Sequence, residues 1–327
     1  MRIFSGIQPT GELHIGNYLG AIKQWKKLQE DEDCVFSIVD LHALTSDYDP
    51  DDLREKVINT AIVYLAAGID PEKVTMFVQS EVKEHTELCW YLNTITPIGE
   101  LERMTQYKEK SDRKKKRSNA GLLNYPVLQA ADILLYDTEV VPVGEDQIQH
   151  IELARDIAKK FNRKFGKTFK LPEHKLSKTG ARIMSLKNPE NKMSKSGRKG
   201  NAISLFDDPD TIKDKVMSAV TDTDNKIKYD QKDKPAVSNL LIIYSEFKGE
   251  SIEDCEQELR GKSYKEFKES LTDLLIEKLA PFRKKKSELE MRREVYVEEI
   301  LSQGNRKAAS YASSKIVEVR RNMGLIK

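Results

Sequence analysis

Cysteine is scarce in this chain of 327 residues. The three cysteines, Cys34, Cys89 and Cys255, lie far apart and form no CxxC pair. This spacing argues against a disulfide framework, and it argues equally against a zinc or iron–sulfur site built from neighbouring residues. We therefore expect no protein-held metal and no iron–sulfur cluster.

Long apolar runs and an excess of charge of one sign are also missing. No stretch reaches the roughly 20 apolar residues of a transmembrane helix, and the first residues lack the pattern of a signal peptide. Lys and Arg number 55 and Asp and Glu 53, which gives a formal net charge of +2. We expect a cytoplasmic protein with no membrane partner, and any surface that binds nucleic acid must be a local basic patch.

Strands and helices alternate along the first part of the chain. Residues 2–7, 35–39 and 74–78 are β-prone runs, and a helical pattern over residues 51–67 ends before Gly68. This alternation predicts an α/β fold, a doubly wound parallel sheet of the Rossmann type. At 327 residues the chain is long enough for two domains.

An insertion interrupts this alternation at about residues 81–123, which are helical and less regular. Within it, residues 108–121 have the composition of a solvated loop. A helix over residues 127–136, a strand over residues 139–143 and a helix over residues 146–161 then complete the sheet.

The remainder of the chain has a helical rhythm throughout. We expect a catalytic domain over residues 1–205 and an all-helical domain over residues 206–327, in which Gly304 separates off a last helix.

The first polar motif is Pro9-Thr10-Gly11-Glu12-Leu13-His14-Ile15-Gly16-Asn17, at the junction of the first strand and first helix. Open α/β sheets bind ligands at such junctions, and Gly16 lets a nucleotide ring or another backbone approach closely. His14 and Asn17, three residues apart, share one helix face and can donate to phosphate oxygens. From spacing alone, a turn glycine, a capping Asn and a surface His explain the motif equally well.

The second motif, Lys192-Met193-Ser194-Lys195-Ser196, is a Ser-rich loop with two lysines. Two ammonium groups on a mobile loop supply point charges for a polyphosphate. Taken alone, a solvated basic loop is the commoner explanation of such a sequence.

Together and in this order, the two motifs resemble the signatures of class I aminoacyl-tRNA synthetases. The sequence around them is similar to that of bacterial tryptophanyl-tRNA synthetases, in the same order from Ile3 to about Leu241. The matching segments are residues 6–11, 99–104, 130–136, 141–147, 180–186 and 219–223. The resemblance implies a ligase that forms tryptophanyl-adenylate from L-tryptophan and ATP and transfers the acyl group to tRNA(Trp). Mg²⁺ would enter on the phosphates of ATP.

Adenylate formation needs in-line positioning and cations near the leaving pyrophosphate. The catalytic residues that the resemblance implies are His14, Asn17, Lys110, Lys192 and Lys195. The ATP site would be lined by Gln8, Pro9, Thr10, Gly16, Asn17, Gly144, Glu145, Asp146, Ile183, Lys192, Met193, Ser194, Lys195 and Ser196.

Asp132 is the residue that we expect to recognise tryptophan. The indole N–H is a donor, so a buried carboxylate can select it, and such a site rejects phenylalanine. Without the resemblance, Asp132 reads more simply as the N-cap of a helix that starts at Ile133. The other implied residues of this pocket are Phe4, Gly6, His42 and Val143 as walls, and Tyr125 and Gln147 near the amino group; His150 is expected to be structural.

Gln129 departs from the family pattern, which has Met before Ala-Ala-Asp. A buried Gln needs a hydrogen-bond partner, and a Gln-x-x-Asp pair is also found in some tyrosine enzymes. A tyrosine-specific ligase of the same fold is therefore an alternative. Two alternatives are more distant. The long helical half and the complete second motif argue against a nucleotidyltransferase, and the intact lysines and His14 argue against a non-ligase RNA-binding paralogue.

The helical half would recognise the anticodon, and the insertion would help to form a homodimer across which one tRNA binds. Pairs and runs of basic residues in the helical half, such as residues 283–286, are candidates for phosphate contacts, although solvated helix faces explain most of them.

Overall fold

A computed structural model describes residues 1–9, 12–108, 119–176, 183–194 and 200–325 of the chain. Its strands form one sheet in which every paired neighbour is parallel, in the order β3-β2-β1-β4-β5. The strands are β1 (Arg2–Ile7), β2 (Asp33–Ile38), β3 (Val74–Val78), β4 (Val140–Val143) and β5 (Glu173–Leu176). This confirms the predicted α/β fold of the Rossmann type, including the completion of the sheet after the insertion.

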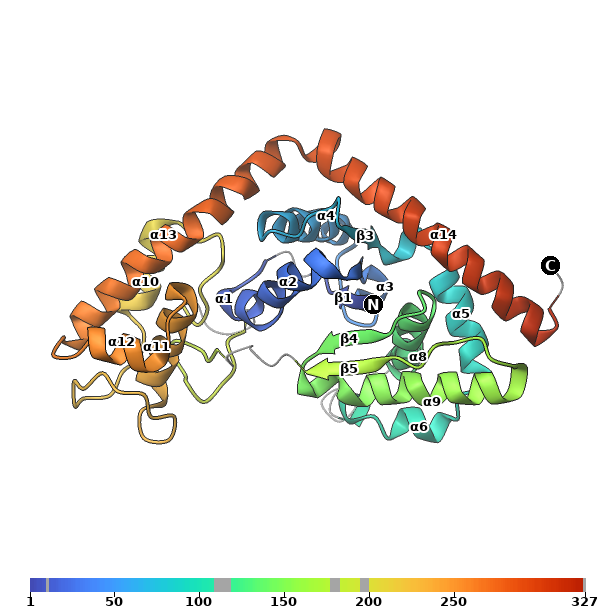
Figure 1. Cartoon of the computed structure of the whole chain (residues 1–327), viewed down its shortest axis with the longest axis horizontal. Helices are drawn as coiled ribbons and strands as arrows, with labels where there is room; N and C mark the ends of the chain where they lie inside the picture. Colours follow the sequence, from blue (N-terminus) through green and yellow to red (C-terminus); the bar gives the residue numbers. More distant parts are fainter. Residues whose placement is uncertain (10–11, 109–118, 177–182, 195–199, 326–327) are drawn as a thin grey trace.

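Helices of the sheet-bearing part cover both faces of the sheet (Figure 1). They are α1 (Ile15–Asn17), η1 (Tyr18–Ile22), α2 (Lys23–Asp31), α3 (Asp40–Ala43), α4 (Pro50–Ala66), η2 (Gln79–Glu81), α5 (Glu84–Asn93), α6 (Ile98–Glu102), α8 (Ala120–Leu134), η3 (Glu145–Gln147) and α9 (Ile148–Phe165).

Side chains alternate between two apolar cores because successive residues of a strand point to opposite faces. Cys34, Phe36 and Ile38 of β2 join the core formed with α2 and α4, whereas Val35 joins the core formed with α5, α8 and α9. The continuous apolar segments that predict the first three strands are thus explained by a sheet that has helices on both faces.

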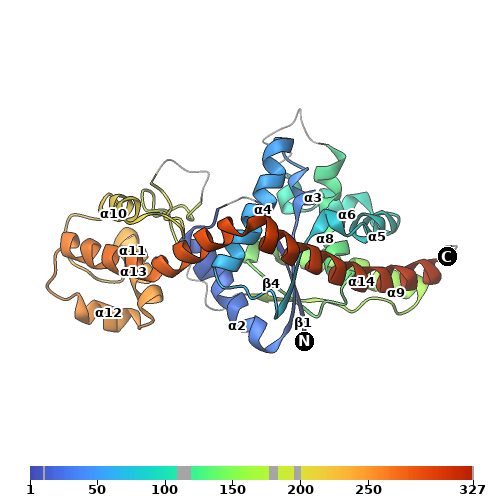
Figure 2. The same cartoon turned by 90° about the horizontal axis from the view of Figure 1, so that it is seen from above.

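The last part of the chain is helical, as expected. Its elements are α10 (Pro209–Met217), α11 (Pro235–Lys248), α12 (Ile252–Glu258), α13 (Tyr264–Met291), η4 (Arg293–Val297) and α14 (Glu298–Met323). The helices α10 to α13 gather beside the sheet, and α13 and α14 form two long arms that meet at an elbow (Figure 1). Viewed from above, α14 runs back across the sheet-bearing part (Figure 2).

Gly304 does not separate two helices, so that prediction is wrong. It lies inside α14, where a Cβ atom would stand 1.7 Å from the carbonyl oxygen of Met76 in β3. The glycine is needed for close packing of the helix against an edge strand and not for a break. The neighbouring Asn305 Oδ1 accepts a hydrogen bond from Val78 N at 2.9 Å, which satisfies a donor of that edge.

The region before Asp132 also differs from expectation. α8 begins at Ala120 with Asn119 as its N-cap, so Ala120 and Gly121 belong to a helix and not to a solvated loop. Asp132 lies well inside α8, which rules out its alternative role as an N-cap. The strand β5 was not predicted, because its residues are all exposed and polar in pattern.

Among the described helices, none is both long enough and apolar enough to cross a membrane.

Candidate functional site

The topology of the sheet brings two predicted segments to one edge. The strand order reverses direction between β1 and β4, and open parallel sheets bind ligands at the carboxyl ends of strands beside such a switch point. Gln8 follows the end of β1, and Gly144 follows the end of β4. Both residues are exposed, as are Glu145 and Asp146 in the turn after Gly144.

The first motif forms a reciprocal cap at the start of α1. Asn17 N donates to His14 Nδ1 and His14 N donates to Asn17 Oδ1, both at 3.2 Å. Because Nδ1 acts as an acceptor, the proton of the neutral imidazole is on Nε2. The side-chain amide of Asn17 uses its oxygen in the cap, so its NH₂ group is its donor for a ligand. Both expected catalytic side chains of this motif are therefore held in place as hydrogen-bond donors.

The second motif lies against the first, although nearly 180 residues separate them in the sequence. A Cβ atom on Gly16 would meet His14 Nδ1 at 2.9 Å, so glycine leaves room for the capping imidazole. It would meet Ile183 Cβ at an ordinary 3.5 Å, so Ile183 lies beside Gly16. Met193 N in turn donates to Ile183 O at 2.9 Å, and Met193 is buried. Met193 anchors the start of the lysine motif in the core, while Lys192 beside it is exposed.

Asp132 is the centre of a buried polar cluster. It is only 1% exposed, and its Oδ2 lies 2.7 Å from His42 Nε2. Its Oδ1 lies 2.6 Å from His85 Nδ1 and accepts a bond from Gln79 Nε2 at 2.7 Å. Burial by itself raises the pKa of Asp132, but the hydrogen bonds and charges of His42 and His85 outweigh it and hold the pKa well below its usual range. The carboxyl is therefore ionised and is purely an acceptor.

The other residues expected around tryptophan divide between this cluster and its surroundings. The His42 and Tyr125 rings make an edge contact with centroids 6.3 Å apart, and Tyr125 OH lies 3.0 Å from His150 Nε2. Gln129 Nε2 donates to Gln147 Oε1 at 3.4 Å, so the unusual Gln has a partner.

The strand ends complete this set. The strands β1 and β4 are neighbours, with Ile3 paired to Val140, and Gly6 and Val143 lie at or next to their carboxyl ends. Phe4 is buried in the core, where its ring stacks on Tyr136 at 5.8 Å.

Four expected site residues, Thr10, Lys110, Lys195 and Ser196, fall outside the described residues.

Sequence reasoning missed three members of the Asp132 cluster, namely Gln79, His85 and Tyr136. Gln79 directly follows β3, so the rule that ligands bind at carboxyl ends of strands could have identified it. His85 lies on α5 and Tyr136 follows α8, and nothing in their spacing indicates that His85 Nε2 and Tyr136 OH lie 2.7 Å apart.

The residues that directly follow the first motif contact the helical half. Tyr18, directly after Asn17, packs its ring against Phe247 of α11 and Phe282 of α13, with centroids 6.2 and 5.1 Å apart. Lys23 forms an ion pair with Glu246 at 2.7 Å nearby. The helical segment that begins with His14 and Asn17 thus continues into residues that contact α11 and α13.

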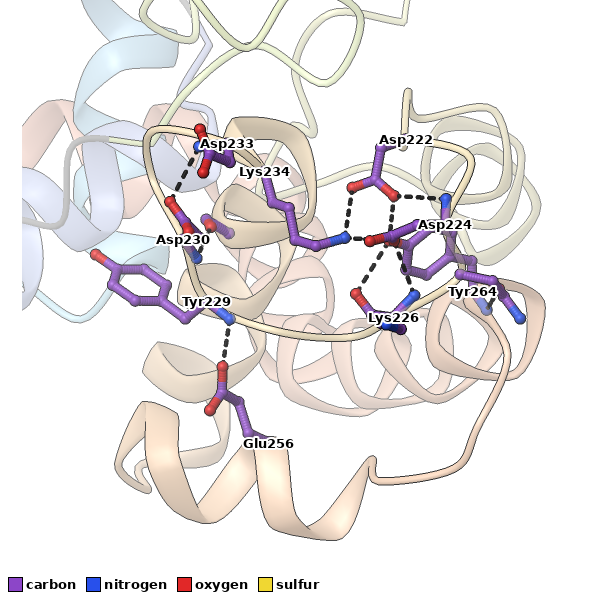
Figure 3. A network of polar contacts seen from close by, with 11 residues as sticks. Asp222, Asp224, Lys226, Tyr229, Asp230, Asp233, Lys234, Glu256 and Tyr264 are labelled. Atoms are coloured by element: carbon purple, nitrogen blue, oxygen red, sulfur yellow. Dashed lines mark hydrogen bonds and ion pairs between the residues drawn. The ribbon is translucent and has the colours of Figure 1, made fainter.

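A second polar cluster in the helical half has a structural explanation (Figure 3). Tyr264 OH donates to Asp222 Oδ1 at 2.5 Å, and the ammonium of Lys234 contacts Asp222 and Asp224. Lys234 occupies the position between the carboxylates that a cation would take. The cluster therefore ties residues 222–234 to the start of α13. Within the described ranges, no three His, Cys, Asp or Glu side chains are grouped so that they could hold a metal ion.

Comparisons with known proteins give one family. The family model described as class I tRNA synthetases (W and Y) matches residues 1–280. The chain is 50% identical to a tryptophan–tRNA ligase of Caldanaerobacter subterraneus subsp. tengcongensis over 326 residues, covering 99% of this chain and 98% of the relative. It is 52% identical to that of Halalkalibacterium halodurans over 324 residues, covering 99% and 97%.

Solved structures give the same result. The tryptophanyl-tRNA synthetase of Campylobacter jejuni complexed with ADP and tryptophan is 39% identical with a TM-score of 0.87, covering 99% of this chain and 100% of that one. A tyrosyl-tRNA synthetase of Archaeoglobus fulgidus shares the fold at 21% identity and a TM-score of 0.67, covering 87% of this chain and 90% of that one.

Proposed function

The chain belongs to the class I aminoacyl-tRNA synthetases for tryptophan and tyrosine and is a tryptophan–tRNA ligase, and on this basis we propose which residues perform each part of its reaction. In the first step a carboxylate oxygen of tryptophan attacks the α-phosphorus of ATP, and pyrophosphate leaves. In the second step the acyl group passes to the terminal ribose of tRNA(Trp). A tyrosine-specific ligase and a non-ligase paralogue are not favoured, because the full-length relatives near 50% identity are tryptophan ligases.

ATP binds, in our proposal, along the switch-point edge between the first motif and the lysine motif. The donors on His14 Nε2 and on the Asn17 amide contact its phosphates, and Ile183, which lies beside Gly16 and accepts from Met193 N, connects the two motifs. Gln8 and Pro9, with the turn Gly144–Asp146, line the rest of the site. Mg²⁺ accompanies ATP as part of the substrate.

Lysines neutralise the pyrophosphate as it leaves. Lys192 is exposed beside the buried Met193, so its ammonium can reach a ligand while the backbone stays anchored. From the family resemblance we assign the same role to Lys110 and Lys195, and we place Ser196 in the lining of the ATP site. Lys195→Ala is expected to slow adenylate formation far more than it weakens tryptophan binding, and equal losses in both would contradict a charge role in the transition state.

Asp132 selects tryptophan by accepting the indole N–H. The observation that carries this proposal is a carboxylate that is 1% exposed and held ionised by its neighbours. A buried ionised acceptor left without its donor costs free energy, which disfavours phenylalanine in the same pocket. His42, Tyr125, Gln147, Gly6, Val143 and Phe4 are proposed to shape this pocket.

Amino-acid-dependent ATP–pyrophosphate exchange tests this assignment. Asp132→Asn should raise the KM for tryptophan about 10- to 100-fold, the effect of losing about 1.5–3 kcal/mol in a hydrogen bond to a charged group. The KM for ATP should stay unchanged. Asp156→Asn, at an exposed Asp of α9, is the matched control. An unchanged tryptophan KM in Asp132→Asn would show that Asp132 does not recognise the indole.

Gln129 is proposed to orient Gln147 by the bond between their side chains. Gln129→Met removes that bond and supplies the residue typical of the family. We expect it to change the affinity for tryptophan analogues altered near the amino group. An unchanged analogue profile would contradict this role.

The enzyme is proposed to be a cytoplasmic homodimer with a catalytic domain over residues 1–205 and a helical, anticodon-recognising domain over residues 206–327. Trp90 and Ile98, in the insertion, are 68% and 64% exposed, as expected for residues that a partner subunit covers. Sedimentation of the wild type and of Trp90→Ser measures the assembly state. A monomeric wild type would contradict the dimer.

Lys284 and Lys285 on α13 are the proposed tRNA contacts of the helical half, since both are exposed. The neighbouring Arg283 instead donates to backbone carbonyls of Asp207 and Ile276. The double variant Lys284→Ala/Lys285→Ala should raise the KM for tRNA without altering ATP–pyrophosphate exchange. A loss of exchange would point to a structural role.

A further inference from the structure

The two oxygens of Asp132 are used unequally. Oδ1 receives two donors, Gln79 Nε2 and His85 Nδ1, whereas Oδ2 receives His42 Nε2 alone among the described residues. A carboxylate oxygen has two lone pairs, so Oδ1 is saturated and Oδ2 retains one acceptor position. This accounting leaves one place where an indole N–H can bind.

His85 is the least expected member of this cluster. It is fully buried, and its ring stacks on Phe77 with centroids 5.7 Å apart. Its Nε2 lies 2.7 Å from Tyr136 OH, so each ring nitrogen has a defined partner. Because the carboxylate can only accept, His85 Nδ1 carries a proton and acts as the donor to Oδ1.

We propose that His85 is a positioning residue for amino-acid selection, which saturates Oδ1 of Asp132 so that Oδ2 alone faces the indole N–H. This inference rests on the assignment of Asp132 as the indole acceptor. His85 touches the carboxylate and not the substrate, and it acts by fixing the rotation of the carboxylate and keeping it ionised.

A buried carboxylate that loses this donor is expected to protonate more readily. Burial already favours the neutral form of Asp132, and the bonds from His42 and His85 oppose it. Without the bond from His85 the carboxyl takes up a proton at a higher pH, and tryptophan binding is lost there. The other titratable groups that face this pair are His42 on α3, Tyr136 after α8, and Glu84 and Cys89 on α5 itself.

Two amide variants separate positioning from packing. The amide nitrogen of Asn takes the place of His Nδ1, so His85→Asn retains the donor toward Asp132. The longer His85→Gln places its amide near Nε2, where it faces Tyr136 and leaves Oδ1 one donor short. If His85 merely filled space, Gln would be the better substitute, because it is closer to His in volume.

The experiment is ATP–pyrophosphate exchange with the full-length enzyme, measured across pH. We expect His85→Gln to raise the KM for tryptophan about tenfold or more, the loss typical of one hydrogen bond to a charged group, with an unchanged KM for ATP. Its kcat/KM for tryptophan should fall at a higher pH on the acid side than that of the wild type. His85→Asn should stay near the wild type in both. The same substitutions at His174, exposed on β5, are the matched controls.

Three results overturn the inference: both variants behave as the wild type, both lose activity equally, or Gln is tolerated better than Asn. Asp132→Asn separates this failure from that of the proposed function. If Asp132→Asn raises the tryptophan KM and the His85 variants follow one of those three patterns, only the role of His85 is wrong. If Asp132→Asn has no effect, the assignment of the indole acceptor is wrong as well.

A spectroscopic measurement on the wild type covers the case in which a variant fails to fold. The chain has five histidines, so a ¹⁵N-histidine spectrum is simple to assign. We expect the ring N–H at Nδ1 of His85 to be present and to be protected from solvent exchange. An unprotonated Nδ1 would overturn the inference.

Discussion

Replacing Gly304 by alanine should destabilise the enzyme, although alanine is the better helix former. Gly304 lies inside α14, and an added Cβ would stand 1.7 Å from the carbonyl oxygen and 2.7 Å from the carbonyl carbon of Met76. A carbon–oxygen contact normally needs about 3.3 Å or more. The helix would therefore have to move away from β3 by roughly 1.6 Å, the difference between these two distances.

Such a movement has two costs and one gain. Overpacking costs about 1–3 kcal/mol, and stretching the bond from Val78 N to Asn305 Oδ1 removes about 1 kcal/mol more. The higher helix propensity of alanine returns about 1 kcal/mol. The net effect is a loss of about 1–3 kcal/mol in the free energy of unfolding, which lowers the Tm by a few degrees.

Thermal and urea unfolding of the wild type and the variant measure this loss. Gly20→Ala is the control, because Gly20 is also inside a helical segment but a Cβ there meets nothing within 4 Å. We expect that control to be neutral or slightly stabilising. If Gly304→Ala were as stable as Gly20→Ala, the close packing of α14 on β3 would be refuted.

Three further results are expected. The pKa of Asp132 is depressed in the folded enzyme, so its contribution to stability is present above the ordinary carboxyl pKa and is lost as the pH falls below it. Between about pH 5 and pH 3 the free energy of unfolding, measured with urea, should therefore fall less in Asp132→Asn than in the wild type. Burial raises the pKa of the Cys34 thiol to about 12, so a thiol reagent at pH 8 should react with it only after unfolding; rapid reaction in the native state would contradict its burial. Asn17→Ala removes half of the reciprocal cap with His14 and should lower the free energy of unfolding by about 1 kcal/mol. The loss in activation free energy calculated from the kcat of exchange should be larger than this. The reverse order would show that the cap is purely structural.

Local signals in the sequence were sufficient for most of the sheet. The first three strands and the helix over residues 51–67 follow from their apolar patterns, because a covered parallel strand is a short apolar run between turns. β5 has no such pattern, since its exposed edge position does not require apolar residues. Gly304 could not be interpreted from the sequence either, because a glycine in a helical pattern is compatible both with a break in the helix and with a close packing contact.

The site divides in the same way. The order of the two motifs and the sequence between them determined the enzyme class and the substrate, because the matching sequence segments are short, contiguous and specific. The tertiary structure alone decided that Ile183 lies against Gly16, and that Gln79 and His85 share one oxygen of Asp132. Contacts between residues tens of positions apart leave no periodicity in the sequence. They arise from the packing of α5 against α8 and of the lysine-motif segment against α1, which only the folded chain brings together.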